Sequence, residues 1–160
     1  MRDKQFVAVH RGGELSKENH SRLMHWGRLC ALRGLSLLKD SIDARLEHAL
    51  VVAEAWEKGE TSVGEAQRAS VAAHAAARES SDPVSTAVAR AIGHAVATAH
   101  MADHSLGGAL YVLKAIKLAG GAIDQEKKWQ MEQLQSMGLP SELVTLIQKN
   151  LTVKEKALIK

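Results

Sequence analysis

Residues 62–121 are unusually rich in alanine, and this density constrains the fold more than any other feature of the chain. Alanine has the highest helix propensity, so we expect the stretch to be helical. Ser62 with Glu65 predicts a capping box at the start of one helix, and Asp82 followed by Pro83 predicts the start of a second. A face of methyl groups fills only the narrow gap between closely packed backbones. The stretch therefore predicts a helical hairpin whose second helix runs unbroken to Gly120.

Further helix signals flank this hairpin. Capping residues and apolar spacing predict helices over about 16–37, 41–58, 124–138 and 141–150, followed by a short one after Thr152. We expect an all-α fold, a compact bundle of five to seven helices around the alanine-rich hairpin. A chain of 160 residues is long enough to form a single domain spanning 1–160. Residues 1–15 are predicted as an extended arm with a short strand at Gln5–Val9, and 151–160 as a frayed tail.

Composition narrows the class of protein. The single cysteine, Cys30, cannot form an intramolecular disulfide and favours a reducing compartment. The chain has no apparent signal peptide and no run near the roughly 20 apolar residues that span a bilayer, so we expect a cytoplasmic location and no membrane association. A net charge of +3, from 21 basic and 18 acidic residues, favours solubility over a nucleic-acid groove, so we expect no nucleic-acid partner. The weaker alternative is nucleic-acid binding through Lys154 to Lys160, which the low aromatic content disfavours.

The second alanine-rich segment carries a carboxylate where its pattern calls for a hydrophobe. The apolar stripe of this expected helix steps by four residues from Val84 to Val96 and would continue through Ala99 to Asp103. His100 and His104 flank Asp103, and His74 on the preceding helix is expected to point inward or toward a neighbouring helix. The sequence thus predicts a buried polar cluster or a ligand site. Its members are His74, Arg78, His94, His100, Asp103 and His104.

His100, Asp103 and His104 are the candidates for a metal site, because His100 and His104 would lie one helical turn apart. The run A-H-M-A-D-H lacks the glutamate of an H-E-x-x-H zinc helix. On one continuous helix, His94 would lie about 15 Å from His104 at 1.5 Å per residue, too far to share a metal. The simpler interpretation is a buried Asp103 that accepts hydrogen bonds from histidine or arginine. We expect no metal and no cofactor.

The sequence predicts no catalytic residue. Cys30 lies among Leu29, Ala31 and Leu32 on an expected helix, where a free cysteine acts as a small hydrophobe. Gly107 and Gly108 have no strand before them and no G-x-G-x-x-G around them, so they indicate a close helix crossing or a kink.

Several blocks with fixed polar residues resemble a bacterial immunity-protein family of polymorphic-toxin systems. The similarity begins with W-x3-C-A-x-R at Trp26, covers about Met24 to Pro140, and departs at Glu54 and Gln67, where the family pattern has arginine. The tail after Pro140 is additional. The other blocks are A-W-x-x-G-E-x-S-V-G-E-A ending at Ala66, A-H-x-A-A-R at 73–78, G-H-A-x-A-T-A-H-x-A-D-H at 93–104, and W-Q at 129–130.

The resemblance implies a non-catalytic protein that binds and neutralises a partner, a toxin protein. The alternative is a small enzyme or metal-dependent protein that uses the His/Asp group; whether the protein forms a homodimer stays open. No run of Asp or Glu stands out, so a broad acidic surface that imitates nucleic acid is not expected. We expect binding through a mixed surface with apolar anchors, near the first helix or the Gly138–Pro140 turn.

Overall fold

The computed structural model describes residues 2–159 and is all-α, as the sequence predicts. Within these residues it contains seven α-helices and no strand; Ala8 and Leu15 form an isolated β-bridge. No helix of this part of the chain is long and apolar enough to cross a membrane. The helices are α1 (Lys17–Leu32), α2 (Ala44–Glu57), α3 (Val63–Glu79), α4 (Pro83–Ala97), α5 (Ser105–Leu118), α6 (Asp124–Ser136) and α7 (Ser141–Leu158).

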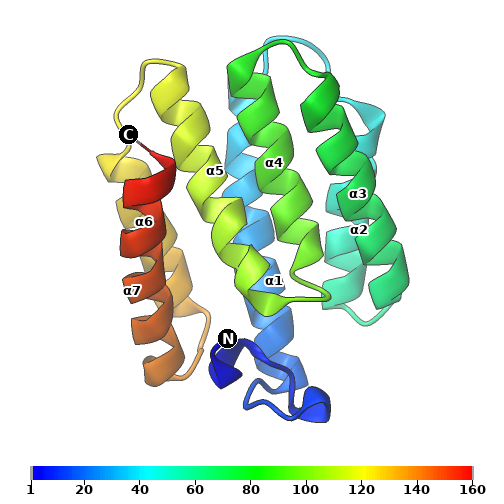
Figure 1. Cartoon of the computed structure of the whole chain (residues 1–160), viewed down its shortest axis with the longest axis vertical. Coiled ribbons are helices and arrows are strands. Elements are labelled where there is room, and N and C mark those ends of the chain that lie inside the picture. The colour runs from blue at the N-terminus through cyan, green and yellow to red at the C-terminus, as the bar shows by residue number, and fades with distance from the viewer. Residues whose placement is uncertain (1, 160) are drawn as a thin grey trace.

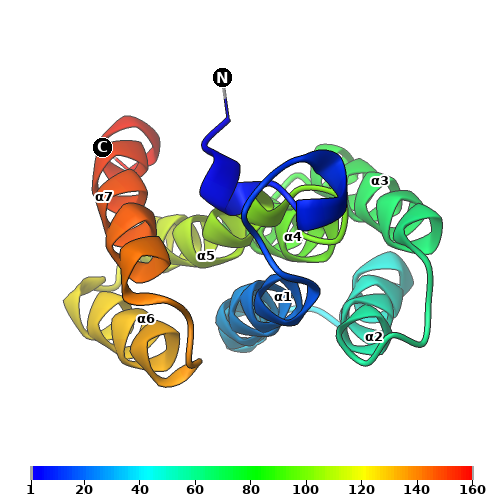
Figure 2. The same ribbon diagram turned by 90° about the horizontal axis from the view of Figure 1, so that it is seen from below.

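The helices form two layers (Figure 2). One layer contains α2, α1 and α6, and the other contains α3, α4, α5 and α7 in that order. The chain runs upward and downward in successive helices from α1 to α5, and the α6–α7 hairpin packs beside α5 and α1 (Figure 1). Helix α4 lies between α3 and α5 and also contacts α1 and α2, so it is the centre of the bundle.

The predicted starts of α3 and α4 are confirmed by N-cap hydrogen bonds. The Ser62 hydroxyl accepts a hydrogen bond from the Glu65 backbone N–H at 3.1 Å, and Asp82 accepts one from Ser85 N–H at 3.1 Å. Asp43 caps α2 in the same way, because its carboxylate accepts from Arg45 N–H at 2.8 Å. Each cap pairs a backbone donor that the first turn of a helix leaves free.

Alanine packing explains the close approach of the helices. The faces that α3 and α4 turn toward each other are lined by buried alanines, and the Ser70 hydroxyl donates to the Gly93 carbonyl at 2.9 Å across this contact. The predicted close crossing at Gly107–Gly108 is confirmed at Gly108. A Cβ there would lie 2.8 Å from the Gly27 carbonyl oxygen, so α5 can cross α1 at this distance only without a side chain.

The prediction of one helix from Pro83 to Gly120 is wrong. Helix α4 ends at Ala97, the short 3-10 helix η4 covers Ala102–His104, and α5 then folds back along α4. The break follows Thr98, whose carbonyl oxygen lies 2.5 Å from His20 Nε2 of α1. Folding back buries alanine faces of α4 on both sides, against α3 and α5, which a single long helix could not achieve.

The two ends of the chain also differ from the prediction. Residues before α1 form two 3-10 turns, η1 (Lys4–Phe6) and η2 (Val9–Arg11), rather than an extended arm, because Phe6 and Leu15 are buried in the core. At the other end, α7 continues without a break to Leu158. The Thr152 hydroxyl donates back to the Gln148 carbonyl at 3.0 Å instead of capping a new helix, and Leu151 and Leu158 pack against the core.

Candidate functional site

Four imidazole rings lie in a row across α3, α4 and the α4–α5 connection. The ring centroids of His74 and His94 are 4.9 Å apart, those of His94 and His104 are 5.4 Å apart, and those of His104 and His100 are 5.3 Å apart. The predicted separation of about 15 Å between His94 and His104 is wrong, because it assumed a continuous helix. Their Nδ1 atoms are 3.3 Å apart, since the chain turns back between them.

Two glycines make room for this row. A Cβ at position 93 would lie 2.7 Å from His74 Nε2, and one at position 107 would lie 2.6 Å from His94 Cγ. Neither Gly93 nor Gly107 has a positive φ, so space rather than backbone conformation requires glycine here. The rings of His74 and His94 therefore rest directly on the backbones of α4 and α5.

The end of the row at His74 lies in a surface concavity of about 580 Å³, which we call the α3–α5 concavity. Arg90 of α4 donates from a terminal guanidinium nitrogen to His74 Nδ1 at 2.7 Å. A guanidinium can only donate, so the imidazole accepts at Nδ1 and is neutral, with its proton on Nε2. The Tyr111 ring of α5 stacks on His94 with a centroid distance of 5.1 Å. The lining residues are Val71, His74, Arg78, Arg90, His94 and Tyr111.

Burial and neighbouring cations keep these histidines uncharged. Burial lowers the pKa of His74 to about 4, with further lowering from the positive charge of Arg90. The pKa of His94 is also lowered to about 4, mainly by burial and then by His74 and His104. Burial lowers the pKa of His104 as well, against the opposing effect of Asp103.

The arginines of the α3–α5 concavity differ from most others in the protein. No carboxylate lines the concavity, and within residues 2–159 neither Arg78 nor Arg90 forms an ion pair. The arginines that do pair with a carboxylate are Arg2, Arg22, Arg28, Arg33, Arg45 and Arg68. The concavity thus combines positive charge with unused hydrogen-bond donors, which suits an anionic group.

Asp103 and His100 lie at the other end of the row, against the N-terminal segment. Asp103 is in the short 3-10 helix η4 rather than on an α-helix, and its carboxylate accepts a hydrogen bond from Arg2 Nε at 2.9 Å. Arg11 donates to the His100 carbonyl oxygen at 3.4 Å. Of the six residues predicted as one cluster, the structure places His74, Arg78 and His94 in the concavity and Asp103 and His100 away from it, with His104 between them.

Within residues 2–159, no group of three or more His, Cys, Asp or Glu side chains is arranged to hold a metal ion. His100, Asp103 and His104 are therefore not brought together as ligands in this structure. Cys30 is fully buried in a part of the core that also contains Trp26 and Leu106, and burial raises the pKa of its thiol well above the ordinary value. A protonated, buried thiol is a weak nucleophile.

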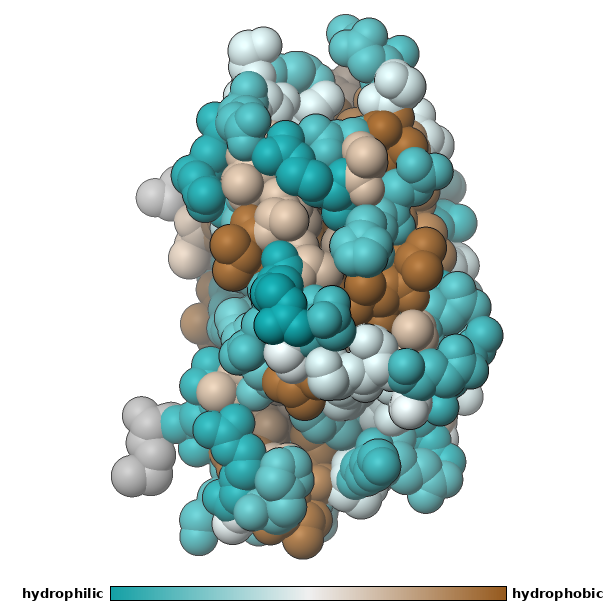
Figure 3. Space-filling view, turned by 90° about the vertical axis from the view of Figure 1, so that its right-hand side faces the viewer, coloured by the Kyte–Doolittle hydropathy of each residue, from teal (hydrophilic) through white to brown (hydrophobic). Residues whose placement is uncertain are grey.

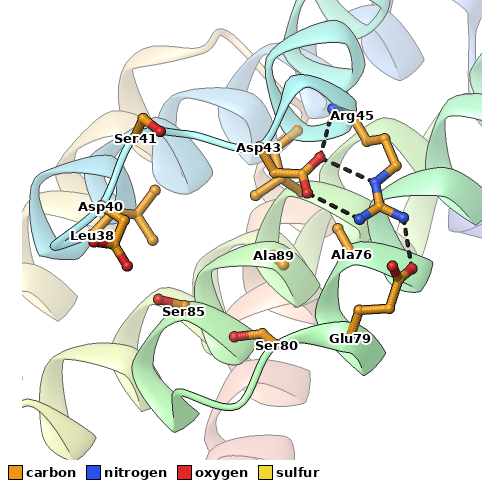
Figure 4. Close-up of a pocket in the computed structure, with 11 residues that line it drawn as sticks. Leu38, Asp40, Ser41, Asp43, Arg45, Ala76, Glu79, Ser80, Ser85 and Ala89 are labelled. Atoms are coloured by element: carbon orange, nitrogen blue, oxygen red, sulfur yellow. Dashed lines mark hydrogen bonds and ion pairs between the residues drawn. The ribbon is translucent and has the colours of Figure 1, made fainter.

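A second pocket, of about 370 Å³, lies where the segment before α2 meets the end of α3 and the start of α4 (Figure 4). Its central feature is Arg45, which donates to Asp43 at 2.9 Å and to Glu79 at 2.7 Å. The hydrogen bonds from Arg45 lower the pKa of Asp43. Two of its three lining carboxylates, those of Asp43 and Glu79, already pair with Arg45, so we interpret these contacts as a tie between α2 and α3.

Comparison with family models gives one match, to residues 13–137, described as Imm-5 like putative immunity protein. The chain belongs to this Imm-5 like family. The match confirms the resemblance found in the sequence and extends from just before α1 to the end of α6, so it contains the whole α3–α5 concavity and leaves α7 outside. Comparisons of this Imm-5 like chain with curated proteins and with solved structures found no match.

Sequence reasoning missed three residues that line the concavity, Val71, Arg90 and Tyr111. Arg90 lies four residues before His94 and so on the same face of α4, a signal that was present in the sequence. Tyr111 could not be found this way, because its contact with His94 exists only once α5 folds back on α4.

Proposed function

We propose that this Imm-5 like protein is an immunity protein, which binds a toxin protein in the cytoplasm and neutralises it without catalysing a reaction. The observation that carries the proposal is the family match over residues 13–137, because it covers six of the seven helices that the described residues form. A single cysteine, Cys30, that is buried and outside any disulfide is consistent with a cytoplasmic location.

The geometry of the Imm-5 like fold supports binding better than chemistry. The polar groups of the α3–α5 concavity are cationic or neutral. Arg90 donates to His74 Nδ1, and the lowered pKa values of His74 and His94 keep both rings uncharged near neutral pH. Arginine and tyrosine are enriched among the side chains that contribute most to binding energy at protein interfaces, and an exposed valine adds apolar contact area. In the α3–α5 concavity these residues are Arg78, Arg90, Tyr111 and Val71.

The test is protection from a candidate toxin domain, taken from the genes that neighbour the one for this chain. Cells that express the toxin domain alone should stop growing, and cells that also express the Imm-5 like protein should grow and yield a stable complex on purification. Growth arrest in spite of well-expressed, folded Imm-5 like protein would contradict the proposal for that toxin. If the neighbouring genes form a metabolic operon with no toxin gene, the immunity function itself is contradicted.

A further inference from the structure

We propose that the α3–α5 concavity is the surface that receives the partner, and that it binds the carboxylate of an aspartate or glutamate side chain on the partner's surface. The inference rests on the proposed function, since it identifies where an immunity protein of this structure would hold its toxin. It assigns Arg78 and Arg90 as the anchors of that contact.

The first argument concerns unused donors. One terminal nitrogen of Arg90 donates to His74, and the other N–H groups of Arg90 have no acceptor among residues 2–159. None of the side-chain N–H groups of Arg78 has an acceptor among these residues. A guanidinium presents parallel N–H groups that match the two oxygens of a carboxylate. Two such groups on adjacent helices, at the rim of one concavity with no lining carboxylate, form a receptor for an acidic side chain.

The second argument concerns the fixed position of Arg90. Arg90 is half-buried and held against His74, and its backbone belongs to the alanine-packed centre of the bundle. Little side-chain freedom is then lost on binding, which favours affinity. The guanidinium also lies close to the neutral imidazoles of His74 and His94 rather than to a competing anion.

The third argument is the apolar rim. Val71 lies in the concavity and is 67% exposed, and Val63, two helical turns earlier on α3, is 42% exposed. Figure 3 shows the side of the molecule formed by α2 and α3, where several hydrophobic areas lie among hydrophilic side chains. An arginine pair with aliphatic and tyrosine neighbours matches a partner segment that has one acidic residue flanked by apolar ones.

Other surfaces offer less to an acidic partner. The region near the first helix and Gly138, where the sequence suggested binding, has its arginine occupied: Arg22 donates to Glu18, to Asn19 and to the Gly138 carbonyl. In the second pocket Arg45 is likewise occupied by Asp43 and Glu79, and the lining carboxylates would repel an acidic side chain. We therefore place the contact on α3, α4 and α5.

The experiment measures binding of the neighbouring toxin domain by calorimetry to three forms of the full chain. The forms are the wild type, the double variant Arg78→Gln with Arg90→Gln, and the control Arg68→Gln. Glutamine keeps much of each side-chain stem. Arg68 is also on α3 but pairs with Glu65 outside the concavity, so it controls for loss of one surface charge. We expect a 10- to 100-fold loss of affinity for the double variant and less than threefold for the control.

A second measurement gives the chemical class directly. A hexaglutamate peptide and inorganic phosphate are titrated separately into the labelled protein, and the ring resonances of His74, His94 and Tyr111 are followed by NMR. We expect shifts with the peptide that are lost in the double variant and weaker shifts with phosphate. Tighter binding of phosphate, or no peptide response at these rings, would overturn the carboxylate assignment.

The outcomes separate the two proposals. If the wild type fails to bind the toxin while the peptide shifts the three rings, the proposed function fails for that toxin and the anion site stands. If the wild type binds the toxin and the folded double variant binds equally well, the site assignment is wrong and the immunity function stands. Melting curves of all variants show that each is folded.

Discussion

His74 of α3 accepts a hydrogen bond from Arg90 of α4 at 2.7 Å, and this contact sets where positive charge lies in the α3–α5 concavity. It fixes the neutral tautomer of His74 and holds a cation at the rim of the concavity. The same histidine packs edge-on against His94, so the contact links the arginine to the row of imidazoles that follows the α4–α5 turn. Protonation of the row would place further positive charge beside Arg90.

Stability should therefore fall in mild acid. In the folded protein His74 and His94 have pKa values of about 4, whereas in the unfolded chain each has the ordinary value near 6.5. Between these values the unfolded state binds more protons, so the free energy of unfolding decreases as the pH falls from 6.5 toward 4. Because both rings are only half-buried, we expect a total loss on the order of 1–3 kcal/mol after solvent screening.

Urea unfolding at pH 7 and pH 5 measures this loss. The variant His94→Gln should lose less stability over the same interval than the wild type. A free energy of unfolding that does not change between these pH values would contradict the neutral, buried state of the row.

Filling the space above Gly93 should be costly. In Gly93→Ala the new methyl would lie 2.7 Å from His74 Nε2, so the ring or the helix must move. We expect a loss of about 1–3 kcal/mol from overpacking, read as a lower thermal midpoint. Gly64→Ala is the matched control, because its methyl would meet only atoms at 3.6 Å or beyond. That control should be neutral or more stable by about 0.5–1 kcal/mol, since alanine is the better helix former.

The ion pair between Arg2 and Asp103 should anchor the N-terminal segment. Removing the acceptor in Asp103→Ala leaves Arg2 without its carboxylate, and we expect a loss of about 1–2 kcal/mol. Arg2→Ala should cost less than about 1 kcal/mol, because the arginine side chain is 38% exposed. A double-mutant cycle from melting curves gives the coupling; additive effects of the two changes would show that the pair contributes nothing.

Local signals in the sequence predicted the helix starts well, because Ser62 and Asp82 act through hydrogen bonds to their own neighbouring backbone. The break after Ala97 had no such signal. No glycine or proline marks it, and it depends on α1, whose His20 contacts the Thr98 carbonyl, and on the burial of α4 between two helices.

The candidate site was predicted in part for the same reason. The sequence indicated some of the residues that belong to the site, since polar side chains within an alanine background are unusual. It could not indicate the distances between them, because His94 and His104 meet only through the reversal of the chain. At the C-terminal end the sequence predicted a break that does not exist. Thr152 resembled a helix cap, but α7 continues past it because Leu151 packs against the core.

The measurement that tests the central claim most directly is an NMR cross-saturation map of the Imm-5 like protein bound to its neighbouring toxin domain. Saturating the toxin should attenuate the methyl signals of Val71 and the ring signals of Tyr111, with Val63 affected less. The methyls of Val51 on α2 and Val153 on α7, which are similarly exposed, serve as internal controls and should stay unchanged. Attenuation confined to α6, α7 or the Gly138 turn, with Val71 and Tyr111 untouched, would contradict binding through the α3–α5 concavity.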